Sequence, residues 1–90
     1  MKHPNGGGYV ADTAFVADTA FVGLCARVEG RAQVVDRAVV CDDAIVCDNA
    51  RISGEAIVCD NARISGDAWV CGSSILGHDS RISGNSKVTL

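Results

Sequence analysis

Small and aliphatic residues alternate with a period of six along nearly the whole chain. From Asn5 to Val88 the sequence divides into fourteen hexads with a small fourth residue and an aliphatic sixth residue. The fourth position is Gly8, then Ala in ten successive hexads, then Ser in three. Apolar residues at i and i+2 are typical of a strand with one buried face and do not form a helical stripe. The pattern therefore predicts an all-β chain of short strands.

The second hexad position predicts the corners between these strands. It holds Asp or Gly in twelve of the fourteen hexads, with Leu24 and His78 as the exceptions. Gly adopts positive φ without steric cost, and Asp hydrogen-bonds to nearby backbone, so both residues suit tight corners. A short repeat that never loses register indicates a solenoid. The repeat is strongest at residues 47–58 and 59–70, which agree at ten of twelve positions.

The fifth position, which points outward where the sixth points inward, indicates the length of one coil. At a spacing of three hexads it sorts into three columns, one of them wholly apolar, whereas a spacing of two hexads mixes Arg with apolar residues. We therefore predict a three-sided solenoid with an 18-residue coil, with four to five coils over residues 9–90 and a short tail or partial cap at residues 1–8. The columns are Phe21, Val39, Ile57 and Ile75; Tyr9, Arg27, Ile45, Arg63 and Arg81; and Phe15, Gln33, Arg51, Trp69 and Lys87.

This pattern resembles that of the hexapeptide-repeat superfamily over almost the whole chain. In that family an aliphatic residue is followed by Gly, Ala, Glu or Asp, then by two free positions and a small residue. The segments V-A-D-T-A-F from Val10 and I-S-G-E-A-I from Ile52 fit it. The resemblance implies a single-domain left-handed parallel β-helix, with lateral packing of three prisms. Many members are acyltransferases, and some are zinc-dependent carbonic anhydrases.

Composition and charge narrow the classes of partner and cofactor. A net charge of −3 argues against nucleic-acid binding. No apolar run is long enough for a membrane span, and the first residues lack the apolar segment of a signal peptide, so we expect a cytoplasmic protein without a membrane partner. The cysteines number five, which is odd, and form no CxxC pair. We therefore expect reduced thiols, no metal site and no cofactor.

Catalysis has few candidate residues. Acyltransferases of the superfamily use a catalytic His and a looped-out segment, but the repeats here contain no insertion. The histidines are His3 and His78, whereas a carbonic anhydrase of this type needs three as zinc ligands. At the corner of His78, Cys, His and Asp converge, which suits a metal site or a general base; the alternative is a solvated acidic corner with one tolerated His. We expect no enzyme activity and keep an acyltransferase-like enzyme, or a degenerate one, as an alternative function.

The wholly apolar outer column predicts an interaction surface. Contiguous apolar patches on soluble proteins usually mark such surfaces, although strands also tolerate β-branched residues on their outer face. We expect self-association into a homo-oligomer, a trimer before a dimer. The leading hypothesis is a non-catalytic assembly or protein-interaction module whose contact residues are Phe21, Val39, Ile57 and Ile75.

One corner of the predicted prism is acidic and suggests another function. Its stacked residues suit a small acidic inhibitor, similar to those of phages, that binds a heterologous partner protein through salt-sensitive contacts. Cys41 and Cys59 share this corner, and we expect them to stack as two free thiols. The acidic residues of the corner are Asp42, Asp43, Asp60 and Asp79.

Overall fold

The computed structural model describes residues 6–88, which form fourteen two-residue strands and no helix. Each strand occupies the fifth and sixth positions of a hexad, as the pattern predicts. Among these residues no helix is long and apolar enough to cross a membrane. The strands are β1 (Tyr9–Val10), β2 (Phe15–Val16), β3 (Phe21–Val22), β4 (Arg27–Val28), β5 (Gln33–Val34), β6 (Val39–Val40), β7 (Ile45–Val46), β8 (Arg51–Ile52), β9 (Ile57–Val58), β10 (Arg63–Ile64), β11 (Trp69–Val70), β12 (Ile75–Leu76), β13 (Arg81–Ile82) and β14 (Lys87–Val88).

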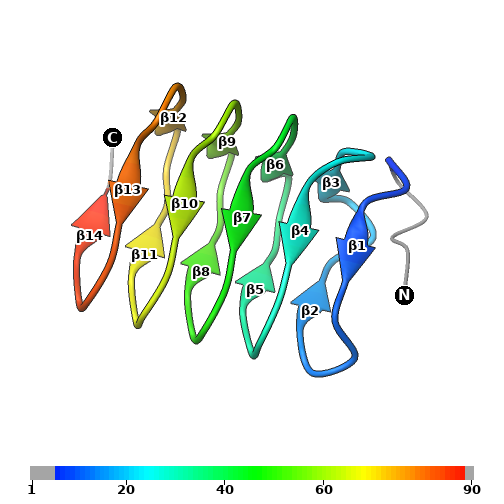
Figure 1. The fold of residues 1–90 in the computed structure, drawn as a ribbon, viewed down its shortest axis with the longest axis horizontal. Helices are drawn as coiled ribbons and strands as arrows, with labels where there is room; N and C mark the ends of the chain where they lie inside the picture. The colour runs from blue at the N-terminus through cyan, green and yellow to red at the C-terminus, as the bar shows by residue number, and fades with distance from the viewer. Residues whose placement is uncertain (1–5, 89–90) are drawn as a thin grey trace.

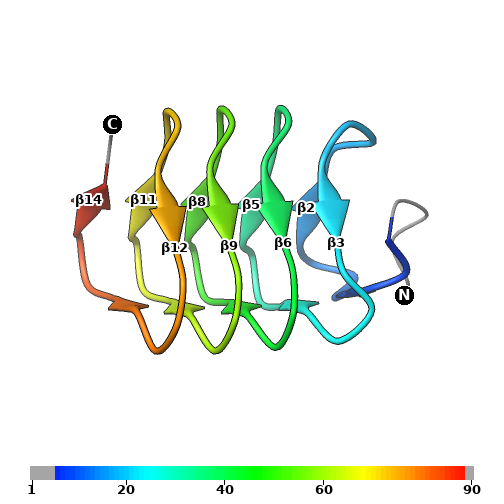
Figure 2. The same ribbon diagram turned by 90° about the horizontal axis from the view of Figure 1, so that it is seen from above.

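Three parallel sheets form the sides of a solenoid, as Figures 1 and 2 show. Face A contains β1, β4, β7, β10 and β13; face B contains β2, β5, β8, β11 and β14; and face C contains β3, β6, β9 and β12. Neighbouring strands in each sheet lie three hexads apart in the chain, so that Tyr9 lies opposite Arg27. Fourteen strands at three per coil give between four and five coils. The predicted all-β, three-sided solenoid with an 18-residue coil is confirmed.

The interior consists of one aliphatic and one small residue from every hexad. All sixth-position side chains from Val22 to Val70 are fully buried, and the Ala residues from Ala20 to Ala68 are at most 1% exposed. Removing this apolar surface from water is the main favourable term in folding. The interior is narrow, so Ala at the fourth position leaves room for the aliphatic side chains that enter from the three faces.

The corners use the left-handed backbone conformation that the second position predicts. Eleven of the fourteen second-position residues have positive φ, and the exceptions are Asp12, Asp18 and Leu24 on the first corners. We expected the Asp side chains to bond locally, but each observed bond instead reaches the next coil. An Oδ2 atom accepts from the backbone N–H at the equivalent position of that coil, in the pairs Asp36 to Gly54 (3.0 Å), Asp42 to Asp60 (3.2 Å), Asp48 to Gly66 (3.0 Å) and Asp60 to His78 (2.9 Å).

The glycines before β1 pack against β3. The N–H of Gly8 donates to the carbonyl of Val22 at 2.9 Å. A Cβ on Gly8 would lie 2.2 Å from the carbonyl oxygen of Gly23, so only glycine fits this approach. Residues 1–5 of the predicted tail lie outside the described residues.

Candidate functional site

Face C brings the four apolar outer residues into one ladder. Phe21 lies opposite Val39, Val39 opposite Ile57, and Ile57 opposite Ile75. Phe21 and Ile75 are 36% and 68% exposed, while the two residues between them are half-buried by their neighbours. The ladder presents an apolar strip without a charged residue to the outside of the prism.

The outer ladders of the other two faces include charged residues. On face B the Lys87 ammonium lies 4.7 Å from the centre of the Trp69 ring, within the range of a cation–π contact. On face A, Arg27 forms an ion pair with Glu29 at 3.3 Å. Face C is therefore the face whose outer ladder contains no charged residue, although Tyr9 on face A and Phe15 on face B are also exposed.

Leu24 is a further exposed apolar residue, which the hexad pattern marks only as an exception at the corner position. It is 75% exposed on the corner that follows β3. The sequence does contain a signal for this exposed residue, because Leu24 is a large apolar residue at a hexad position otherwise held by Asp, Gly or His. Leu24 lies on the same corner of the prism as the acidic residues, one coil before Asp42.

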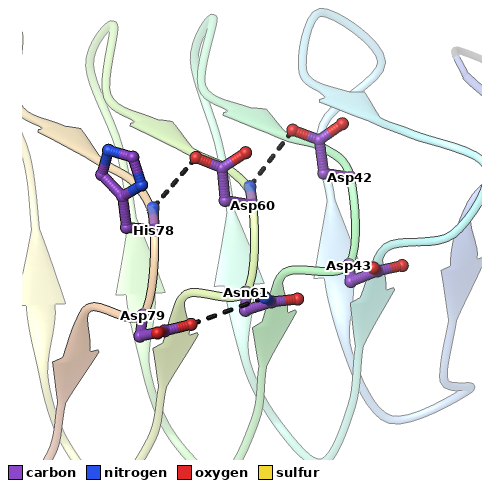
Figure 3. A pocket seen from close by; sticks show the side chains of 6 residues that line it. All are labelled: Asp42, Asp43, Asp60, Asn61, His78 and Asp79. Carbon is purple, nitrogen blue, oxygen red and sulfur yellow. Dashed lines mark hydrogen bonds between the residues drawn. The ribbon is translucent and has the colours of Figure 1, made fainter.

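The acidic corner between faces C and A is hollowed. Figure 3 shows two rows of side chains along this corner, one from each of two successive positions on three coils. Together they line a shallow, open hollow of about 470 Å³. Asn61 Nδ2 approaches Asp79 Oδ1 at 3.5 Å within the second row. The lining residues are Asp42, Asp60 and His78 in one row and Asp43, Asn61 and Asp79 in the other.

His78 lies in this hollow, at the end of one of its two rows. Asp60 accepts a hydrogen bond from the backbone N–H of His78, not from its ring. Within residues 6–88 no hydrogen bond orients the imidazole, whereas a catalytic base needs a partner that holds its ring towards the substrate. His78 also adopts φ 55°, the left-handed conformation of its column. This geometry favours the structural interpretation of the residue.

All five cysteines are free thiols, as the sequence predicts. Burial raises the pKa of the Cys41 thiol to about 11, with smaller contributions from Cys59 and Asp42 beside it. Burial also raises the pKa of Cys47. The Cys41 and Cys59 sulfur atoms and an Asp42 carboxylate oxygen all lie within 4.8 Å of one another. The sequence predicts the stacking of the two thiols but not the approach of the carboxylate.

Comparison with known proteins supports the architecture. The family described as the YdcK β-solenoid repeat matches residues 44–60 and 56–72. The two matched segments begin two hexads apart, which is the offset between the tandem copies of the sequence. No curated protein matches the chain, and no solved structure does. The repeat match and the three stacked sheets together identify the chain as a β-solenoid repeat protein.

Proposed function

We propose that this β-solenoid is a non-catalytic assembly module that self-associates through face C. The observation that carries the proposal is the uncharged apolar ladder from Phe21 to Ile75, which runs along one whole side of a regular prism. Burying such a strip against a second copy removes apolar surface from water, which is the general driving force of association.

A second copy of the chain fits face C better than a flexible peptide does. The ladder lies on the outer side of a four-stranded sheet, and the corner residues before and after each strand form its two margins. Arg37 and Glu55 supply exposed charges at the margin before β6 and β9. An apolar centre with a polar rim is the usual anatomy of an interface between folded surfaces. We favour a trimer, in which three prisms meet face to face, and place a dimer second.

The proposal includes membership of the hexapeptide-repeat superfamily, with the left-handed coil and lateral trimer that this membership implies. The hexad pattern supports it, since aliphatic and small residues recur in the family's order. It also includes a cytoplasmic location, because five free thiols suit a reducing compartment.

The test replaces apolar residues of face C by charge and measures solution mass. In the double variant Phe21→Asp, Ile57→Asp, carboxylates replace two of the four ladder residues and must be desolvated on association. We expect it to be monomeric by light scattering at protein concentrations where the wild type is oligomeric. Burying unpaired charges is costly, so the loss of association should be complete at these concentrations.

The matched control is Ile45→Asp, which alters the same hexad position on face A. Ile45 is half-buried like Ile57, and it lies between Arg27 and Arg63 in its ladder. This variant should keep the wild-type mass. A double variant that retains the full oligomeric mass, with an unchanged far-ultraviolet circular dichroism spectrum, contradicts the proposal.

The acidic hollow favours a second candidate function, that of a small inhibitor that binds a basic site on another protein. It concentrates Asp42, Asp43, Asp60 and Asp79 on one corner, and complementary charge mainly raises association rate and salt sensitivity. A captured partner should be released as salt is raised from low to physiological concentration. Binding that is indifferent to both salt and Asp43→Asn, Asp79→Asn contradicts this second proposal.

A further inference from the structure

The corner between faces C and A brings two thiols onto consecutive coils. Cys41 and Cys59 occupy the first hexad position on these coils, with Gly23 one coil before them and Gly77 one coil after. Cys47 and Cys71 occupy the same hexad position on the other two corners, where Ser65 follows Cys47 by one coil and Ser53 precedes Cys71 by one coil. The Cys41–Cys59 pair is therefore the one place in the described corners where thiols stack.

A carboxylate joins the two thiols within coordination range. The Cys41 and Cys59 sulfur atoms and an Asp42 oxygen all lie within 4.8 Å of one another. Ligand atoms of a tetrahedral zinc ion lie about 3.5–3.8 Å apart, given Zn–S and Zn–O bonds of about 2.3 and 2.1 Å. Side-chain rotations that close the triangle by roughly 1 Å would place all three atoms on one ion.

The surroundings leave room and negative charge for a cation. A Cβ on Gly77 would lie 3.6 Å from the Cys59 sulfur and 3.2 Å from an Asp60 oxygen, so the missing side chain opens space beside both groups. Asp42 and Asp60 both place carboxylates at this corner, where they line the hollow, and carboxylates attract a cation.

We propose that Cys41, Cys59 and Asp42 form a site for a thiophilic divalent cation of the zinc class, which clamps two consecutive coils. Two thiolates and a carboxylate are a donor set that zinc accepts, and water can fill the fourth position. Binding of one Zn²⁺ releases the two thiol protons to solvent and forms two Zn–S bonds, with no change of oxidation state. From the sequence we expect free thiols and no metal site, with a metal at this corner as the alternative, and the proposal takes up that alternative.

Cobalt(II) is the probe, since thiolate coordination produces a charge-transfer absorption that oxygen ligands alone do not. The full reduced chain is titrated anaerobically with Co²⁺, and Zn²⁺ is then added in competition. We expect one ion per chain, a thiolate band that Zn²⁺ abolishes, and release of about two protons per ion measured with a pH indicator.

Variants separate the proposed site from general thiol chemistry. Cys59→Ser should weaken Co²⁺ binding on the order of 100-fold and diminish the thiolate band, because Cys41 is then the one thiolate ligand left. Cys47→Ser and Cys71→Ser are matched controls from the same hexad position and should change neither. Gly77→Cys adds a third thiol beside Cys59 at a backbone position without positive φ, and it should tighten binding about tenfold or more.

The proposal is overturned if the reduced wild type shows no thiolate band, or if Cys59→Ser leaves both the Co²⁺ affinity and the band unchanged. An equal loss in Cys47→Ser or Cys71→Ser also overturns it. The proposal is also contradicted if Cys41 and Cys59 form a disulfide and the chain binds no metal after that disulfide is reduced. Because these readouts do not depend on solution mass, they remain independent of the proposed self-association.

Discussion

Ile57 and Val58 are successive residues of β9, yet they belong to different parts of the molecule. Val58 is fully buried in the interior column, whereas Ile57 is half-exposed in the outer ladder of face C. The interior column repeats Val, Ile and Ala with little variation on every face. The outer ladders differ from face to face, from the Arg-rich ladder of face A to the uncharged ladder of face C. The interior thus specifies the fold, whereas the outer residues give each of the three faces a different surface.

The largest expected effect comes from charging the interior member of this pair. Val58→Asp buries a carboxylate among Val, Ile and Ala without a partner, and we expect it to cost about 3 kcal/mol or more of unfolding free energy. Ile57→Asp, one residue away, should change the unfolding free energy by less than about 1 kcal/mol. Urea denaturation of monomeric protein, followed by circular dichroism, measures both. Equal losses in the two variants would mean that the inner and outer columns are not distinct.

A side-chain truncation on β10 tests the same difference between inner and outer residues without introducing charge. Ile64→Ala removes a fully buried side chain and leaves a cavity in a narrow interior, which should cost about 2–5 kcal/mol. Arg63→Ala, on the outside of the same strand, should stay within about 0.5 kcal/mol of the wild type. A stable, cooperatively folded Ile64→Ala protein would show that the interior tolerates voids.

The corner residues are not buried in the interior, yet we expect them to affect the unfolding free energy. Gly54 has φ +66°, and an added Cβ would lie 2.8 Å from the Gly72 oxygen and 2.9 Å from its nitrogen. Gly54→Ala should therefore cost about 1–2 kcal/mol. Gly54→Asp should cost about 1 kcal/mol less than Gly54→Ala, because its carboxylate accepts from the Gly72 N–H as Asp36 does from Gly54.

The control for this corner is Gly84, which has φ +63° but no atom within 4 Å of an added Cβ. Gly84→Ala should cost about 1 kcal/mol, because only the left-handed backbone opposes the new side chain. Thermal or urea unfolding ranks the three variants. If Gly54→Asp is no better than Gly54→Ala, the bond between coils contributes nothing to the stability of the corner.

The smallest expected effect is the pH dependence contributed by Cys41. Its pKa is raised to about 11 in the folded chain by burial first, and then by Cys59 and Asp42. A raised folded pKa stabilises the protein below the pKa of the unfolded thiol, about 8.5, and this contribution disappears as pH rises towards 11. The melting temperature should therefore fall less between pH 8.5 and 11 in Cys41→Ser than in the wild type. An identical fall in both proteins contradicts the assignment.

The regular part of the fold could be predicted from the sequence because every hexad has the same pattern of small and aliphatic residues. Residues such as Ala44 and Val46 recur at fixed positions, and a spacing of three hexads alone sorts the outer ladders. The sequence could not predict that Asp48 bonds across coils to Gly66, since that bond depends on a left-handed corner and a particular rotamer. Nor could the sequence predict that the corner at Leu24 forms without the positive φ found at most other corners.

The candidate sites were only partly predictable for the same reason. Spacing places Phe21, Val39, Ile57 and Ile75 in one ladder, and it stacks Cys41 on Cys59. The ring orientation of His78 and the approach of Asp42 to the thiols depend on side-chain torsions, which a repeat pattern does not specify.

The most direct test of the central claim is the solution mass of the wild-type chain, measured by light scattering over a wide range of concentrations. One chain has a mass of 9.3 kDa. If face C is buried by self-association, we expect a fixed mass corresponding to three chains, or else to two. A mass of 9.3 kDa at every concentration would contradict self-association through face C.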